Sequence, residues 1–134
     1  MRAVLDINVL ISGLLAPDGA SARLIRRWLE GDFELVVSER LLAELKRALA
    51  YKKLRARVSE AASDEFIGLV RATATMRPDP TNPPQQSRDP GDDYLIAVAE
   101  SSASILVSGD QDILALSESR PILAPADFEA RLGG

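Results

Sequence analysis

The chain opens with residues 1–15, MRAVLDINVLISGLL, in which one apolar run ends at Leu5 and another begins at Val9. Residues 3–5 predict a short buried strand, and the apolar residues after Asn8 predict a helix that ends near Leu15. Asp6 stands at the junction of these two elements. Because a charge taken out of water costs several kcal/mol unless it is compensated, we expect Asp6 to have a partner.

Strands and helices alternate along the rest of the chain. Residues 17–19 predict a turn, the proline-rich residues 78–92 predict a loop, and Asp89-Pro90 is typical of a helix start. Ser38 is a suitable N-cap for the helix that follows it. We predict further strands at residues 34–37, 105–107 and 122–123, and further helices at residues 24–30, 39–50, 60–73, 92–102, 112–116 and 128–132.

Apolar strands that alternate with helices indicate an α/β protein whose parallel sheet is covered on both faces. A length of 134 residues fits one domain, residues 1–134. Ligands of such sheets bind beyond the carboxyl ends of the strands. Asp6 and Asp110 each follow a predicted strand and Asp92 opens a predicted helix, so we expect these three acids at one edge of the sheet.

Helical spacing refines the choice of acids. Glu44 borders the apolar stripe of its helix instead of pointing fully away from it. Asp92 begins the apolar face of the next acid-bearing helix, whereas Asp93 is rotated from that face by one position. Each acid also has a structural interpretation: Asp6 as the partner of an arginine, Glu44 as a surface acid, Asp92 as a helix cap, and Asp110 as a turn residue.

Convergence of these acids would either raise their pKa values or require a cation. Two carboxylates ~5 Å apart repel each other by roughly 3 kcal/mol at an effective dielectric constant of about 20. The chain contains no histidine and no cysteine, which excludes the usual zinc sites and the Ser/His and Cys/His nucleophile pairs. Oxygen ligands alone favour Mg²⁺ or Mn²⁺, and such ions support reactions at phosphoryl groups.

The charge is unevenly distributed. The net charge is −4, yet ten of the sixteen basic residues lie between Arg23 and Arg57. A basic stretch of this kind is typical of a surface that binds nucleic acid. The solvated faces of two helices explain it equally well.

Four segments of the chain resemble the PIN domain family. VLDINVLISGLL resembles the opening VLDTNVLVSALL of that family, and LLAELKRALAYKKL resembles the helix of its second acid. RDPGDDYLIAVAESSASILVSGDQDILAL is similar to the block of its third and fourth acids, and LAPADFEARL resembles its closing segment. The resemblance spans nearly the whole chain and is greatest for the bacterial and archaeal toxins of toxin–antitoxin pairs, the relatives of VapC.

The resemblance implies a Rossmann-like three-layer α/β/α sandwich with a mostly parallel central sheet. It also implies an endoribonuclease dependent on Mg²⁺ or Mn²⁺ that hydrolyses RNA phosphodiesters. Its catalytic, metal-binding acids would be Asp6, Glu44, Asp92 and Asp110. Asn8 would orient the carboxylate of Asp6, and Asp93 and Asp112 are second choices for the site.

The same resemblance implies partners and a substrate path. Arg26, Arg27, Lys52 and Lys53 are the candidates for contact with the RNA backbone. A cognate antitoxin protein and a homodimer or higher oligomer are typical of the family.

No stretch approaches the ~18 apolar residues of a membrane span, and we expect a cytoplasmic protein. Ile7 departs from the family pattern, because a threonine is common between the aspartate and the asparagine.

Three other functions compete with this interpretation. The alternative is a catalytically silent PIN-like module that binds RNA or protein. A phosphatase or phosphotransferase with Asp6 as nucleophile would need an aspartate in place of Asn8 and a lysine after Lys53, and neither is present. A deoxyribonuclease would use a similar fold and similar metals, so a comparison of RNA with DNA substrates distinguishes it.

Overall fold

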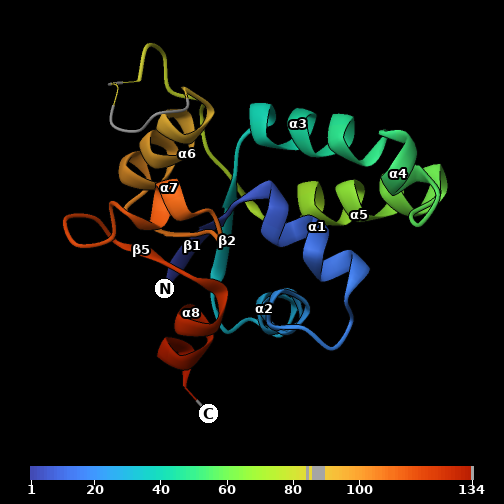
Figure 1. The fold of residues 1–134 in the computed structure, drawn as a ribbon, viewed down its shortest axis with the longest axis horizontal. Helices are drawn as coiled ribbons and strands as arrows, with labels where there is room; N and C mark the ends of the chain where they lie inside the picture. The colour runs from blue at the N-terminus through green and yellow to red at the C-terminus, as the bar shows by residue number, and fades with distance from the viewer. Residues whose placement is uncertain (84, 86–89, 134) are drawn as a thin grey trace.

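The computed structural model describes residues 1–83, 85 and 90–133 (Figure 1). The elements are β1 (Arg2–Leu5), α1 (Ile7–Leu15), α2 (Ala20–Leu29), β2 (Glu34–Val37), α3 (Glu39–Leu49), α4 (Lys52–Arg55), α5 (Glu60–Thr73), β3 (Thr75–Met76), α6 (Pro90–Ser101), β4 (Ile105–Val107), α7 (Gln111–Leu114), β5 (Ile122–Leu123) and α8 (Pro125–Leu132). Of these, β3 and α4 were not predicted from the sequence. Both are too short to show a periodic apolar pattern.

The five strands form one sheet in the order β3-β2-β1-β4-β5, and in the described part of the chain each pair of neighbouring strands is parallel. Figure 1 shows α6 and α7 on one side of the sheet and α1, α3 and α5 on the other. This arrangement confirms the predicted α/β/α sandwich. The strand order reverses between β1 and β4, which is where ligands bind in sheets of this type.

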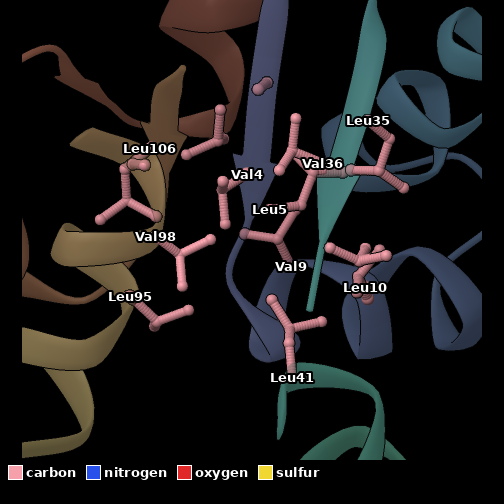
Figure 2. Close-up of a cluster of buried hydrophobic side chains, with 14 of the residues drawn as sticks. Val4, Leu5, Val9, Leu10, Leu35, Val36, Leu41, Leu95, Val98 and Leu106 are labelled. Carbon is pink, nitrogen blue, oxygen red and sulfur yellow. The ribbon is translucent and has the colours of Figure 1, made fainter. Parts of the chain in front are cut away.

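The core surrounds the central strand β1. Residues 3–5 of this strand are at most 1% exposed, because helices cover both faces of the sheet. Figure 2 shows side chains of α1, α3 and α6 meeting those of β1, β2 and β4 in one cluster. Full burial of one leucine or valine side chain contributes ~1.5–3 kcal/mol. The position of Asp6, directly after β1, is therefore set by a well-packed strand.

Side chains at the starts of helices fix where the helices begin. Asp6 caps α1, where its carboxylate accepts a hydrogen bond from the main-chain N–H of Asn8. Ser38 caps α3 as predicted and accepts from the N–H of Leu41 at 3.3 Å. Helix α6 begins at Pro90; its predicted cap, Asp89, lies outside the described residues. Across residues 1–83, 85 and 90–133, no helix combines the length and apolar character that a membrane crossing requires.

Candidate functional site

The ends of β1 and β4 bring Asp6 and Ser108 together. Leu5 pairs with Val107, so the residue that follows each strand occupies the same level of the sheet. The Ser108 hydroxyl donates to Oδ2 of Asp6 at 2.9 Å and accepts from the N–H of Asp110 at 3.0 Å. Ser108 therefore positions both acids at the carboxyl edge of the sheet.

Asp6 is an acid in an unfavourable environment. It is 5% exposed, and this burial is the main cause of a pKa above the usual value of an aspartate. The charge of Asp110 raises the pKa of Asp6 further, whereas the hydrogen bonds from Ser108 and from the N–H of Asn8 lower it. Ionised Asp6 thus lacks full compensation within the protein, and a nearby cation would supply it.

The four predicted acids line one cavity. Asp6, Glu44, Asp92 and Asp110 surround a volume of about 200 Å³ together with Ile7, Asn8 and Leu95. They come from four segments: the start of α1, the middle of α3, the first turn of α6 and the loop after β4. Asp92 is buried, Glu44 is half-buried and Asp110 is exposed, so the cavity extends from the core to the surface.

One wall of this acidic cavity is braced between α3 and α6. The Tyr94 hydroxyl shares a short hydrogen bond with the Ser38 hydroxyl, and burial raises the pKa of Tyr94. The Arg40 guanidinium lies 4.2 Å from the centre of the Tyr94 ring and donates to Glu44 at 3.0 Å. These contacts hold the helix that carries Glu44 against the helix that carries Asp92.

The predicted supporting residues differ in their placement. Asn8 lines the cavity, but it contacts Asp6 through its main-chain N–H at 3.4 Å; no bond from its side-chain amide to Asp6 occurs among the described residues. Asp93 is buried at 4% exposure, although the sequence predicted that it turns from the buried face, and it does not line the cavity. Asp112 is exposed, and its N–H donates to Asp110 at 2.8 Å.

Sequence reasoning missed Ser108. The signal was present, because the register of two neighbouring parallel strands places the first residues after each strand side by side. Ser108 follows ILV in the same way as Asp6 follows AVL. In this structure the side-chain hydrogen bond to the Asp6 carboxylate comes from the hydroxyl of Ser108.

The donor set of the cavity fits a hard divalent cation. Its polar lining consists of carboxylates and one amide, and no lysine or arginine lines it among the described residues. Within the described chain, no three acidic side chains are already arranged to hold one metal ion. Mg²⁺ is usually bound through one or two carboxylates and keeps several waters, which is compatible with acids spread around a small cavity.

The predicted basic candidates fall into two groups. Arg26 donates to a main-chain carbonyl in the turn before α2 at 3.0 Å, and Arg27 forms an ion pair with Asp32. The side chains of Lys52 and Lys53 are exposed on α4 and form no hydrogen bond or ion pair with other described residues. Figure 1 shows α4 at the end of α3 that lies farther from α6.

Solved structures share this fold. PAE2754 from Pyrobaculum aerophilum is 20% identical, with a TM-score of 0.63 over 98% of this chain and 89% of that chain. VapBC2 from Rickettsia felis, solved bound to a DNA fragment from their promoter, is 13% identical, with a TM-score of 0.60 over 92% of this chain and 97% of that chain. A domain of a Methanocaldococcus jannaschii protein is 17% identical, with a TM-score of 0.57 over 92% of this chain and 89% of that chain.

Sequence comparisons agree with the fold. The protein MJ1680 from Methanocaldococcus jannaschii is 25% identical over 125 residues, which are 92% of this chain and 79% of that protein. A family model described as PIN domain matches residues 2–112, a range that contains all four acids of the cavity. The chain belongs to the PIN domain family, whose members are in general nucleases that use divalent metal ions.

Proposed function

We propose that this protein is an endoribonuclease dependent on Mg²⁺ or Mn²⁺ and the toxin component of a toxin–antitoxin pair. The observation that carries the proposal is the cavity lined by Asp6, Glu44, Asp92 and Asp110 at the point where the strand order reverses. Membership of a nuclease family supports the reaction class. We further propose that residues 1–134 form a single PIN domain and that the protein is cytoplasmic.

The four carboxylates would hold the metal, with Asp6 as the ligand whose burial gives it the greatest need of a cation. A bound divalent ion supplies an activated water and neutralises the charge that develops on the phosphoryl group. The Ser108 hydroxyl keeps Oδ2 of Asp6 in one orientation, which preserves the position of a ligand atom. The exposed carboxylate of Asp110 is accessible from solvent and is suited to accept a proton from water.

The test compares cleavage of RNA and DNA oligonucleotides by antitoxin-free protein in Mn²⁺, Mg²⁺ and EDTA. The decisive variant is Asp6→Asn, and Asp64→Asn is its matched control because Asp64 is an exposed acid on α5 outside the cavity. We expect RNA cleavage by the wild type and by Asp64→Asn in metal only. We expect none from Asp6→Asn.

The outcomes separate the competing functions. Metal-dependent cutting of DNA with no cutting of RNA would make the protein a deoxyribonuclease. RNA binding without cleavage in any metal would favour the catalytically silent module that binds RNA or protein. Cleavage of equal rate by wild type and Asp6→Asn would identify a contaminating nuclease and refute the assignment of Asp6.

For the RNA path, Lys52 and Lys53 are stronger candidates than Arg26 and Arg27. A cationic side chain that is already paired within the protein contributes less binding free energy when it contacts a phosphate, because its existing interaction must first be broken. The two lysines have no such interaction among the described residues. The α2 arginines stay as secondary candidates.

An antitoxin partner and a homodimer or higher oligomer complete the proposal. The similarity in fold to VapBC2 of Rickettsia felis supports a partner of the antitoxin type. Light scattering after size-exclusion chromatography would measure the mass of the free protein, and we expect at least twice the chain mass of 14.5 kDa. Loss of cleavage when a candidate antitoxin is added in equimolar amount would support the partnership.

A further inference from the structure

A second cavity adjoins the acidic one. Its volume is about 290 Å³, and its lining includes Asn8, Val9, Ser12, Ser21, Asp110 and Pro125. Two of these residues, Asn8 and Asp110, also line the acidic cavity. The two cavities therefore share a wall. A nucleic-acid strand with one phosphate among the acids would place the adjoining nucleoside in the second cavity.

The lining of the second cavity suits a neutral ligand with polar edges. The Ser12 and Ser21 hydroxyls have no hydrogen-bond partner among the described residues, and each can donate and accept. Val9 and Pro125 add apolar surface. No lysine or arginine lines this cavity in the described part of the chain, and the carboxylate of Asp110 repels a second phosphate.

The close approach of α1 and α2 builds this cavity. A Cβ atom on Gly13 would lie 2.3 Å from Cδ1 of Ile25 and 3.3 Å from the carbonyl oxygen of Ser21. A side chain at position 13 would require Ile25 to change conformation and the Ser21 carbonyl to shift, so Gly13 lets the two helices pack at this distance without such adjustments. Ser21 of α2 thereby lines the same cavity as Val9 and Ser12 of α1.

We propose that the second cavity binds the nucleoside next to the scissile phosphate, with Ser12 and Ser21 as its specificity-determining residues. This inference rests on the proposed nuclease function. The volume lies near the lower end of the ~300–1,000 Å³ of small-molecule sites, which is suitable for one nucleoside unit. Hydroxyl groups bond the polar edge of a base or the hydroxyls of a ribose, while the apolar residues contact its carbon atoms.

The first experiment measures nucleoside binding without requiring cleavage. Adenosine, cytidine and uridine are titrated into isotope-labelled wild-type protein in EDTA, with inorganic phosphate as a separate probe. We expect saturable NMR shifts at Val9, Ser12 and Ser21 with at least one nucleoside and not with phosphate. Ser21→Leu should fill the cavity and weaken binding about tenfold or more, the loss expected from one or two hydrogen bonds and excluded volume.

Two further variants keep the test decisive. Ser12→Leu blocks the same cavity from the exposed face of α1. This variant is used in place of Ser21→Leu if Ser21→Leu disturbs folding. Ser117→Leu places the same change on an exposed serine outside the cavity and should bind nucleosides as the wild type does. Shifts that phosphate reproduces, an absence of saturable shifts, or unchanged binding by both cavity variants would overturn the proposal.

A second experiment separates this inference from the proposed function. Cleavage of RNAs that vary the bases beside the cut is compared for wild type and Ser21→Leu in Mn²⁺. We expect metal-dependent cleavage to persist in the variant with a changed base preference and a kcat/KM about tenfold lower. The same base preference and kcat/KM would refute the cavity's role, whereas an inactive wild type would refute the nuclease and leave the nucleoside titration to decide the site.

Discussion

Replacement of Ser108 by alanine tests how the protein holds its buried acid. The change removes the hydroxyl that donates to Oδ2 of Asp6 at 2.9 Å and the acceptor of the Asp110 N–H at 3.0 Å. Both Ser108 and Asp6 are buried, so water does not readily replace the lost partners. The variant leaves an acid with less stabilisation of its charged form.

The expected magnitude follows from these two hydrogen bonds. A hydrogen bond to a charged group contributes ~1.5–3 kcal/mol, and one between neutral groups ~0.5–1.5 kcal/mol. We expect Ser108→Ala to lower the free energy of unfolding by about 2–4 kcal/mol at neutral pH without metal. At about 4 °C per kcal/mol for a chain of this length, the melting temperature should fall by ~8–16 °C.

The pH dependence gives the prediction a sign. The Ser108 hydrogen bond lowers the pKa of Asp6, so the variant should raise that pKa above its already raised value in the wild type. The difference between the free energies of unfolding of the wild type and the variant should therefore grow as the pH rises from the Asp6 pKa of the wild type to the higher Asp6 pKa of the variant. At lower pH, where Asp6 is protonated in both proteins, the difference should shrink.

Calorimetry of both proteins in EDTA across acidic and neutral pH measures this effect, and repetition in Mn²⁺ measures metal binding. The metal affinity of the variant should fall by about 10–100-fold. Ser63→Ala is the control, because it removes another buried serine hydroxyl that has no side-chain hydrogen bond among the described residues. A destabilisation no larger than that of the control, or one independent of pH, would refute the reasoning.

Three further predictions concern the acids and the lysines. In EDTA at pH 7, Asp6→Asn should have a melting temperature a few degrees above that of the wild type. Burial raises the pKa of Asp6 in the folded protein above its value in the unfolded chain. The stability that protonated Asp6 contributes is therefore complete below the unfolded-state pKa and is lost as the pH rises through the folded-state pKa, a loss that the neutral asparagine avoids. Thermal denaturation measures this, and a lower melting temperature contradicts it. Asp92→Asn should reduce metal-dependent cleavage by about 100-fold or more and Asp93→Asn by less, because only Asp92 lines the acidic cavity; initial rates in Mn²⁺ decide, and the reverse ranking would move the site by one residue. Charge reversal at Lys52 and Lys53 should weaken RNA binding and reduce the slope of log affinity against log salt by about 1 for each lysine in contact with phosphate. Fluorescence anisotropy at several salt concentrations measures that slope, and unchanged binding would mean that α4 does not contact RNA.

Local patterns in the sequence were sufficient to predict most of the helices and strands of the fold. The strands at 34–37, 105–107 and 122–123 occur where their apolar runs predict them. Ser38 caps α3 because a serine before a helical pattern satisfies an otherwise unpaired N–H. The two-residue strand β3 was not predicted, because its existence depends on the neighbouring strand β2 and not on its own residues.

The sequence by itself determined that Asp6 and Asp110 follow parallel strands, and hence that both lie at the carboxyl edge of one sheet. The sequence also led us to expect Asp92 at this edge, and the family resemblance added Glu44. That the side chains of these two acids line one cavity was decided by the tertiary structure, since their separation depends on how two helices on opposite faces of the sheet pack. It also decided that Ser108 orients Asp6, and that Arg26 and Arg27 have partners within the chain while Lys52 and Lys53 have none among the described residues. Periodicity records which face of an element is buried, whereas a hydrogen bond or an ion pair depends on distances between segments that the chain sequence does not contain.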